Sequence, residues 1–285
     1  MEELPRIHWL ASYPKSGNTW VRALLYAYEF GNISLAQMHG HISGDQAPGV
    51  WFASSPVPWG FLNNDQRLLL RYPALMTLIM THSQETIVVK THSANLKVNS
   101  VDMIPEELTG SSVYLVRDPR DVAISYAHHM GIDIDESIDR MGSIGCALDH
   151  QESGIIQALG TWSVNVKSWH EDGHFPRTIV RYEDLLTNPE EELAAIIKCI
   201  YVDEPDMQRV KNAVEICEFD RLKRIEEKDG FREASQHGKF FRKGKSTWRD
   251  ILTYEQVDRI EQDHGEWMYK LGYEFQEEFK LNGTI

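Results

Sequence analysis

Short apolar runs rich in Val, Ile and Tyr alternate along this chain with longer runs of helical periodicity. This alternation is typical of an α/β fold with a parallel sheet. The runs that predict strands carry few polar residues, as strands buried on both faces should. They are Ile7–Ser12, Thr86–Lys90, Ser112–Arg117 and Thr178–Arg181.

Helical periodicity predicts the helices between and after these strands. Pro189 with three glutamates after it favours a helix start, because proline suits the first turn and acids suit the positive end of the helix dipole. The predicted helices are Thr19–Phe30, Asp65–Met80, Arg120–Met130, Ile155–Glu171, Pro189–Ile200, Pro205–Ile216 and Tyr254–Leu271. Residues 37–64 and 131–153 resist assignment, and they are either lids or binding loops, or insertions that cover an edge.

A phosphate-binding turn joins the first predicted strand to the first predicted helix. Residues 12–19 differ from the triphosphate pattern G-x-x-x-x-G-K-[ST], because Ser12 replaces the first glycine and Asn18 replaces the lysine. Lys15 stands at the loop apex instead, where an ammonium suits charge on a bridging oxygen or a leaving phosphate. Backbone N–H groups and the helix dipole attract anions there. We therefore expect a three-layer, P-loop NTPase-like fold with a central parallel sheet flanked by helices. The alternative is an ordinary turn with an incidental lysine.

Net charge restricts the partners of this chain. Its 285 residues include 29 basic and 43 acidic side chains, for a formal net charge of -14. Such a chain repels nucleic acid and anionic membrane, so we expect neither as a partner. An anionic ligand must therefore be held by a local basic cluster. No apolar run reaches the 18 or more residues that a membrane span needs.

The cysteines and the N-terminus favour a cytoplasmic location. Cys146, Cys199 and Cys217 form an odd, widely spaced set, which predicts reduced thiols and no metal site. The acidic N-terminus lacks the apolar core of a signal peptide. No linker marks a boundary, so we expect residues 1–285 to form a single domain. The oligomeric state stays open, with a homodimer as one alternative.

Polar groups follow the carboxyl ends of the predicted strands, where ligands bind in parallel α/β sheets. The first strand ends in the phosphate loop, and the next two end in Lys90-Thr91-His92 and in Arg117-Asp118-Pro119-Arg120-Asp121. Ser125 follows one helical turn later, and the fourth strand ends in Arg181-Tyr182-Glu183-Asp184. Packing alone does not explain this convergence, so we expect one site at these strand ends.

Four segments in this order resemble the signatures of sulfotransferases that use 3′-phosphoadenosine 5′-phosphosulfate (PAPS). They are residues 12–20, 90–92, 116–126 and 240–244, and together they span nearly the whole chain. Asn18 and the Arg-Asp-Pro-Arg-Asp run look like those of soluble bacterial members, including enzymes that modify glycopeptide antibiotics. Residues 242–248 depart from the family pattern, being one residue shorter and lacking its second glycine.

The resemblance implies that a sulfuryl group moves from PAPS to a hydroxyl of a small-molecule acceptor, a phenol or an alcohol, leaving adenosine 3′,5′-bisphosphate (PAP), with no metal required. It also implies the cofactor-binding residues. The 5′-phosphosulfate would be cradled by Lys15, Ser16, Gly17, Asn18 and Thr19. The adenine would contact the rings of Trp20, Phe219 and Tyr182. The 3′-phosphate and its covering loop would involve Arg117, Ser125, Phe241, Arg242, Lys243 and Gly244.

The implied catalytic residues are His92, Lys15 and Lys90. His92 would be the general base, since an imidazole with a pKa near ~6.5 accepts a proton at neutral pH. Lys15 would neutralise the bridging oxygen as the sulfuryl group leaves, and Lys90 would stabilise charge on the transferring group.

Alternatives remain open at this stage. His92 could be a capping or core histidine, and Trp20 and Phe219 could be core aromatics. A P-loop small-molecule kinase is the runner-up function, which Asn18 in the lysine position disfavours, and a non-catalytic nucleotide-binding protein is the third. Aromatic residues within 37–64 indicate an apolar or aromatic acceptor, and His39 or His41 could reach the site.

Overall fold

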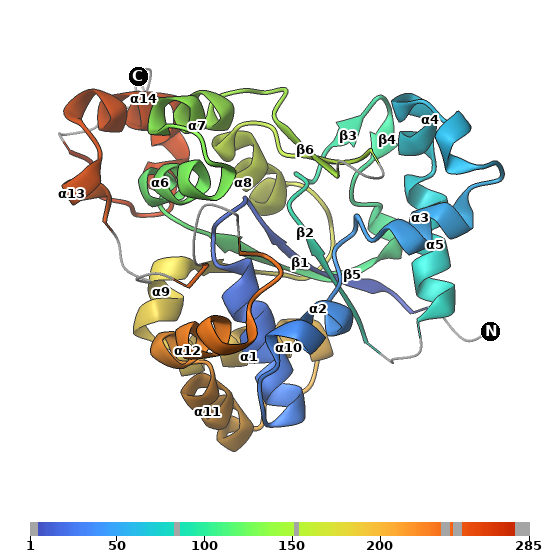
Figure 1. The fold of residues 1–285 in the computed structure, drawn as a ribbon, viewed down its shortest axis with the longest axis horizontal. Helices are drawn as coiled ribbons and strands as arrows, with labels where there is room; N and C mark the ends of the chain where they lie inside the picture. The colour runs from blue at the N-terminus through green and yellow to red at the C-terminus, as the bar shows by residue number, and fades with distance from the viewer. Residues whose placement is uncertain (1–4, 83–85, 151–153, 235–239, 242–246, 277–285) are drawn as a thin grey trace.

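In the computed structural model, four parallel strands form a central sheet with helices on both faces (Figure 1). The structure describes residues 5–82, 86–150, 154–234, 240–241 and 247–276. In spatial order the sheet strands are β2 (Ile87–Thr91), β1 (Ile7–Ser12), β5 (Thr109–Val116) and β8 (Arg177–Arg181). The predicted three-layer arrangement, with its central parallel sheet flanked by helices, is confirmed.

Helices pack on both faces of the sheet, and each face has its own apolar core. One face packs against α5 (Arg71–Thr81), α6 (Pro119–Met130), α7 (Ile134–Met141), α8 (Trp162–Glu171) and α14 (Tyr254–Lys270). The other packs against α1 (Asn18–Phe30), α2 (Leu35–His41), α10 (Pro189–Tyr201), α11 (Met207–Ile216) and α12 (Phe219–Asp229).

Shorter elements connect and surround these layers. The short helices are α3 (Pro48–Ser54), α4 (Asn64–Leu69), α9 (Tyr182–Thr187) and α13 (Trp248–Ile251), with 3-10 turns at Trp59–Phe61 and Glu106–Leu108. Two antiparallel hairpins pair β3 (Lys97–Val98) with β4 (Val101–Asp102), and β6 (Ala147–His150) with β7 (Ile155–Ala158).

Alternate side chains of the strands enter two separate apolar cores. Trp9 and Ala11 of β1 belong to the core beneath α5, α6 and α8, whereas Leu10 belongs to the core beneath α1 and α10. Because both faces are buried, the strands read as nearly continuous apolar runs in the sequence. The first core also buries Trp162 and Trp169 of α8.

Two predicted helices are wrong in part. Residues 155–158 form strand β7, and α8 begins only at Trp162, after Gly160 at φ +66° and the capping hydroxyl of Thr161. Residues 65–80 form two helices that meet at Leu70. Proline cannot continue a helix without losing a hydrogen bond and crowding the preceding turn, so Pro73 explains that break.

The segments without a prediction contain regular structure. Residues 37–64 include part of α2 and all of α3, and residues 131–153 include α7 and β6. The α12 helix was also not predicted. In the part of the chain that the structure describes, no helix has both the length and the apolar character to cross a membrane.

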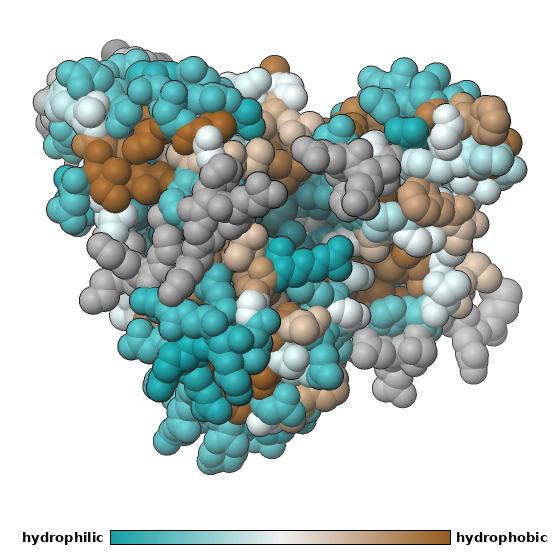
Figure 2. Space-filling view, viewed as in Figure 1, coloured by the Kyte–Doolittle hydropathy of each residue, from teal (hydrophilic) through white to brown (hydrophobic). Residues whose placement is uncertain are grey.

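The carboxyl ends of the sheet strands lie in register at one edge. Ala11 pairs with Thr91 and Ser12 pairs with Leu115. Val116 pairs with Arg181 of the neighbouring strand. The residues that follow these strands therefore meet at one place, and Figure 2 shows a hollow in the middle of this face with hydrophilic residues in its depth.

Candidate active site

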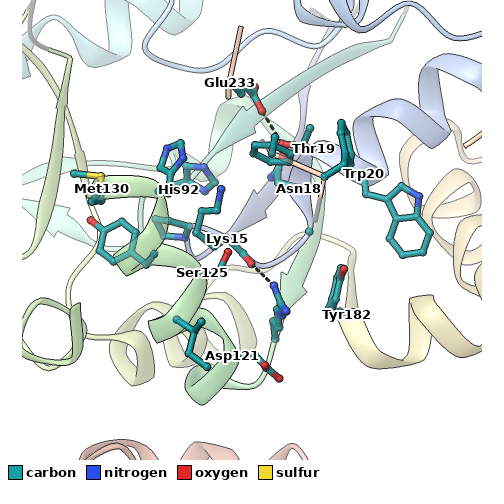
Figure 3. Close-up of a pocket in the computed structure, with 18 of the residues that line it drawn as sticks. Lys15, Asn18, Thr19, Trp20, His92, Asp121, Ser125, Met130, Tyr182 and Glu233 are labelled. Carbon is teal, nitrogen blue, oxygen red and sulfur yellow. Dashed lines mark hydrogen bonds between the residues drawn. The ribbon is translucent and has the colours of Figure 1, made fainter. Parts of the chain in front are cut away.

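A cavity of about 570 Å³ opens at these strand ends. Cofactor and small-ligand sites commonly measure about 300–1,000 Å³. A residue that follows each strand of the sheet lines this cavity: Lys15 follows β1, His92 follows β2, Arg117 follows β5 and Tyr182 follows β8. The register of the sheet thus brings the predicted polar groups together (Figure 3).

The phosphate loop turns sharply between β1 and α1. Lys15 has φ +69° and Gly17 has φ +102°, both in the left-handed region. The Asn18 amide nitrogen donates to the Leu10 carbonyl at 3.1 Å and lies 3.3 Å from the Ser12 hydroxyl. Asn18, which replaces the usual lysine, therefore fastens the loop to its strand and leaves the cationic role in the loop to Lys15.

Gly17 is required by its conformation and by its neighbour. A β-carbon at position 17 would lie 2.6 Å from Cδ2 of Tyr182, whereas one at Gly31 (φ +67°), at the other end of α1, would meet nothing within 4 Å. We expect Gly31→Ala to cost about 1 kcal/mol of unfolding free energy, the left-handed penalty alone. Gly17→Ala should cost more, because it adds a clash with Tyr182. Urea unfolding of both variants measures this, and equal losses would contradict the close approach.

His92 is held as a neutral imidazole with one defined tautomer. Its Nδ1 lies 2.8 Å from the Ser12 carbonyl oxygen, which can only accept, so Nδ1 carries the proton and Nε2 carries the lone pair. Burial lowers the pKa of His92 well below its usual value, and the charges on Lys90 and Lys15 lower it further. The imidazole therefore stays neutral at neutral pH and is able to accept a proton.

The Lys15 and His92 side chains project into the same cavity (Figure 3). The Lys15 ammonium lies 4.2 Å from the centroid of the Phe240 ring. Burial lowers the pKa of Lys90, and the negative charges on Glu233 and Asp45 partly offset this. The cavity thus places two ammonium groups around the imidazole.

Glu233 is an acidic group within this basic cluster. Its carboxylate accepts from the Thr19 hydroxyl at 2.6 Å (Figure 3). It also accepts from Arg22 Nη1 at 2.6 Å. Burial raises the pKa of Glu233, but the charges on Lys90 and Arg22 outweigh burial and lower it to about 2. The carboxylate is therefore ionised, and it holds the Thr19 hydroxyl that the sequence assigned to the cofactor.

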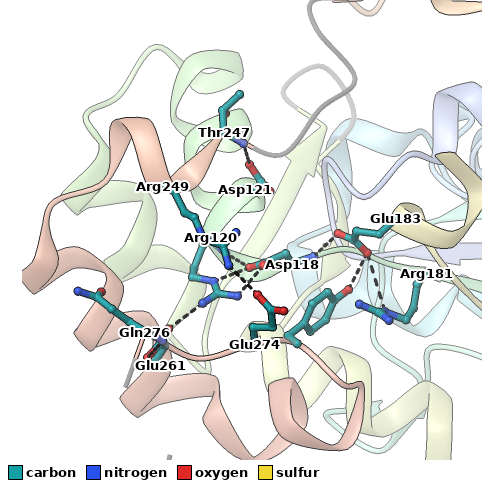
Figure 4. A network of polar contacts seen from close by, with 11 residues as sticks. Asp118, Arg120, Asp121, Arg181, Glu183, Thr247, Arg249, Glu261, Glu274 and Gln276 are labelled. Atoms are coloured by element: carbon teal, nitrogen blue, oxygen red, sulfur yellow. Dashed lines mark hydrogen bonds and ion pairs between the residues drawn. The ribbon is translucent and has the colours of Figure 1, made fainter. Parts of the chain in front are cut away.

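Arg117 contacts the phosphate loop and forms no ion pair with its neighbour Asp118, which pairs with Arg120. Asp118 binds Arg120 at 2.7 Å, and Arg120 also binds Glu261 at 2.7 Å (Figure 4). Arg117 Nη1 instead donates to the Lys15 carbonyl at 3.2 Å, and its guanidinium lies 4.5 Å from the Tyr182 ring centroid. Asp118 therefore pairs with Arg120 and not with Arg117, which lies on the cavity wall.

Aromatic rings form the wall beside α1. The Trp20 ring centroid lies 5.5 Å from that of Phe219 and 6.1 Å from that of Tyr182. Phe241 packs edge-on against Phe219 at 5.9 Å. The Trp20 indole donates to the Cys217 carbonyl at 3.1 Å, which fixes its orientation. These rings all line the cavity, and their contact with adenine stays a prediction.

The structure brings most of the predicted site residues to the cavity. The lining includes Lys15, Gly17, Asn18, Thr19, Trp20, Lys90, His92, Arg117, Ser125, Tyr182, Phe219 and Phe241. Ser16 is not part of this lining; its hydroxyl is buried and has no hydrogen-bond partner among the described residues. Arg242, Lys243 and Gly244 lie outside the described residues. The roles of all these residues stay predictions.

Sequence reasoning missed other lining residues, among them Glu233, His129, Gln46 and Gln157. His129 lies one helical turn after Ser125, so its spacing could have indicated it. Burial lowers the pKa of His129 to about 4, and the charge on Lys15 adds to this effect. Gln157 was hidden by the wrong helix prediction, and no sequence motif marks Glu233.

Three aromatic residues of 37–64, the segment that the sequence linked to an apolar or aromatic acceptor, pack against one another outside the lining of this cavity. Trp59 packs on Trp51 and Phe52, with ring centroids 6.4 and 5.1 Å away. His41 binds Glu29 at 2.9 Å and His39 stacks on Phe231. Within the described part of the chain, these five side chains are absent from the cavity lining.

The three cysteines and the possible metal-binding side chains bear on two further predictions from the sequence. All three cysteines are free, as predicted, and Cys217 is buried. Among the residues that the structure describes, no group of three or more His, Cys, Asp or Glu side chains is arranged to hold a metal ion.

A loop with the geometry of a phosphate-binding turn and an imidazole able to accept a proton line the same cavity, which indicates a group-transfer enzyme with a phosphorylated donor. The chain belongs to the sulfotransferase domain family, whose family model matches residues 5–272. The predicted family and enzyme class are thus confirmed.

Known proteins similar to this chain agree with that assignment. Cytosolic sulfotransferase 13 of Arabidopsis thaliana is 26% identical over 269 residues, which cover 88% of this chain and 74% of that protein. Sulfotransferase 1A1 of Canis lupus familiaris is 25% identical over 280 residues, which cover 93% of this chain and 84% of that protein. A solved structure of retinol dehydratase with androsterone and the inactive cofactor PAP has a TM-score of 0.61 at 20% identity. It covers 99% of this chain and 84% of its own, and it shows the shared fold.

Proposed function

We propose that this chain transfers a sulfuryl group from PAPS to a hydroxyl of a small-molecule acceptor, a phenol or an alcohol, with His92 as the general base. In this proposal residues 1–285 act as one domain. The observation that carries it is the position of His92, whose Nδ1 lies 2.8 Å from the Ser12 carbonyl oxygen in the cavity that Lys15 also lines. An imidazole held in this way presents Nε2 as a proton acceptor.

The residues present fit a cofactor of this chemistry. The cavity volume suits a nucleotide, and Arg117 offers a planar guanidinium, which matches phosphate geometry. The Ser16 hydroxyl, buried between the lining residues Lys15 and Gly17 in the chain and without a partner among the described residues, has a donor to offer. PAP was bound in the retinol dehydratase structure of similar fold. When bound, PAPS supplies an activated sulfuryl group.

Each group of the chain would have a defined part in the reaction. His92 Nε2 would take the proton of the acceptor hydroxyl as its oxygen forms the new bond to sulfur. Lys15 would neutralise the oxygen released on the 5′-phosphate when the old sulfur–oxygen bond breaks. Lys90 would balance charge on the transferring group, while Arg117 and Ser125 would hold the 3′-phosphate. Such transfer depends on positioning and on charge stabilisation.

A labelled-donor screen tests this function. Protein is incubated with PAPS carrying a radioactive sulfuryl group and with phenols, aliphatic alcohols, sugars and peptidic scaffolds. We expect label in at least one hydroxyl acceptor and a matching amount of PAP. Tight PAP binding without transfer to any acceptor class would refute the reaction and leave only the fold and the binding of nucleotide.

Glu233 makes a separate prediction about cofactor affinity. Its ionised carboxylate bonds to Thr19, where an anionic ligand would also bind, so Glu233→Gln should tighten PAP binding by about three- to tenfold at low salt. Titration calorimetry at two salt concentrations measures this, and the gain should shrink at high salt. Glu274→Gln, which removes the same charge from an exposed surface pair, is the control. Weaker PAP binding by Glu233→Gln would show that the carboxylate supports the cofactor instead.

A further inference from the structure

A fully buried carboxylate lies behind the Lys90–Thr91–His92 segment. The Asp45 side chain is 0% exposed, and it accepts from the Thr91 hydroxyl at 2.8 Å and from Arg71 Nη2 at 2.8 Å. Gln157, which lines the cavity, donates to its other oxygen. A buried carboxylate is costly unless it is paired and hydrogen-bonded, so three donors on one carboxylate define its position closely.

The backbone around Asp45 extends the sheet beside Lys90. The Lys90 amide donates to the Ser43 carbonyl at 2.9 Å, and the Asp45 amide donates to the Lys90 carbonyl at 2.9 Å. The indole of Trp51 donates to the Asp45 carbonyl at 2.7 Å. Residues 43–45 thus act as a short additional strand at the edge of the sheet, which fixes Asp45 relative to the end of β2.

Thr91 links this carboxylate to the site. Its hydroxyl donates to Asp45 and accepts from the Ser93 amide at 3.0 Å, so both capacities of the hydroxyl are used. Thr91 stands between two residues that face the cavity, while its own side chain points to the buried side. Any shift of the Thr91 backbone therefore moves Lys90 and His92 together.

The opposite side of the network is also anchored. Arg71 of α5 donates from Nε to the Met103 carbonyl at 2.5 Å while its Nη2 holds Asp45. The network therefore joins α5, the edge segment, β7 and the end of β2. An ion pair that served stability alone would need only Asp45 and Arg71. The carboxylate also accepts hydrogen bonds from Thr91 and Gln157, and these two bonds connect it to the site.

We propose that Asp45 is a positioning residue, whose carboxylate fixes the Thr91 hydroxyl and thereby sets where Lys90 and His92 stand in the cavity. This inference rests on the proposed function, because the geometry that it protects is that of the transfer step. Misplacing a reacting group by about 1 Å can lower a rate by about 100-fold, so the network matters for turnover more than for cofactor binding. Asp45 itself does not touch the reacting atoms.

Thr91→Val tests the inference better than a change at Asp45, because removing the carboxylate would leave Arg71 buried without its charge partner. Valine keeps the shape of threonine and removes the hydroxyl. We expect kcat to fall by about 10- to 100-fold, with the KM for PAPS and the affinity for PAP changed by less than about threefold. Thr91→Ser, which keeps the hydroxyl, should recover most of the turnover.

Thr109→Val is the matched control. The Thr109 hydroxyl is also buried and satisfied twice, by the Trp9 indole at 3.0 Å and the Pro105 carbonyl at 2.8 Å, but it lies at the start of β5, away from the cavity. The Thr109→Val variant should lose about as much unfolding free energy as Thr91→Val and should keep the wild-type kcat. Equal losses of kcat in Thr91→Val and Thr109→Val, or no loss in either, would overturn the positioning role.

A readout that does not need turnover separates this inference from the proposed function. The Nδ1–H proton of His92, held by the Ser12 carbonyl, should give a protected NMR signal in the wild-type protein. We expect that signal to shift or disappear in Thr91→Val and to persist in Thr109→Val. An unchanged signal in Thr91→Val refutes the inference, whether or not an acceptor is found. Absence of transfer by a wild-type protein that binds PAP refutes the proposed reaction instead.

Discussion

His92→Gln should lower kcat by about 10²- to 10⁴-fold, the usual contribution of a general base. Glutamine keeps a polar side chain of similar reach but cannot take up a proton. PAP affinity should stay within about threefold of wild type, because the imidazole acts on the acceptor hydroxyl. Single-turnover transfer of labelled sulfuryl groups measures the rate, and titration calorimetry measures the affinity.

The pH profile makes this prediction specific. Burial lowers the pKa of His92 well below its usual value, so the neutral form dominates at pH 7. The wild-type kcat/KM should therefore stay level on the acid side of neutrality and fall only as the pH drops through that lowered pKa. His92→Gln should lack this acidic limb. His264→Gln is the control, since His264 is also buried with a pKa lowered to about 4 but does not line the cavity. Similar losses of kcat/KM in both variants would show that His92 has no catalytic role.

Lys15→Met should lower kcat by about 10²- to 10³-fold, because methionine keeps most of the length of the side chain and removes the charge that stabilises the leaving oxygen. Unlike His92→Gln, it should also weaken PAP binding, since the same ammonium would contact the 5′-phosphate in the product complex. The two variants thus distinguish a protein residue that acts on the acceptor hydroxyl from one that acts on the sulfuryl donor. The same pair of rate and affinity measurements applies.

Lys167→Met is the control for Lys15→Met, because Lys167 is exposed on α8 and pairs only loosely with Glu171, at 3.7 Å. It changes the net charge equally and should leave both kcat and PAP affinity unchanged. If Lys15→Met kept its turnover, the cation at the loop apex would have no part in the transfer.

The sequence predicted the sheet and the place of the site for a physical reason. Parallel strands buried on both faces are apolar throughout, so polar residues such as Lys90 and Arg117 mark the points where the strands end. Those ends share one edge, so the residues after them meet without any knowledge of the connecting helices. The phosphate loop was also predictable, because its glycine and hydroxyl residues serve a local backbone geometry.

Other parts of the site depend on contacts between distant segments. Asp45 lies in a stretch without periodicity, and only the packing of α5 and the edge of β2 around it gives the carboxylate its partners. Glu233 follows α12 and meets Thr19 and Arg22 across more than 200 residues, for which no local pattern exists. Residues 155–158 are a different case, because they pair locally with β6 in a hairpin and were read as helical from their short apolar run, which does not distinguish a strand from a helix. The break before Pro73, in contrast, was legible in the sequence.

A crystal structure of the protein with bound PAP tests the central claim most directly. The account predicts the 5′-phosphate on the backbone amides of the phosphate loop, within hydrogen-bond distance of Lys15 Nζ, and the 3′-phosphate on Arg117 and Ser125. His92 Nε2 should face the open side of the 5′-phosphate, where an acceptor hydroxyl would approach. A 5′-phosphate bound away from Lys15, or a His92 imidazole turned out of the cavity, would contradict it.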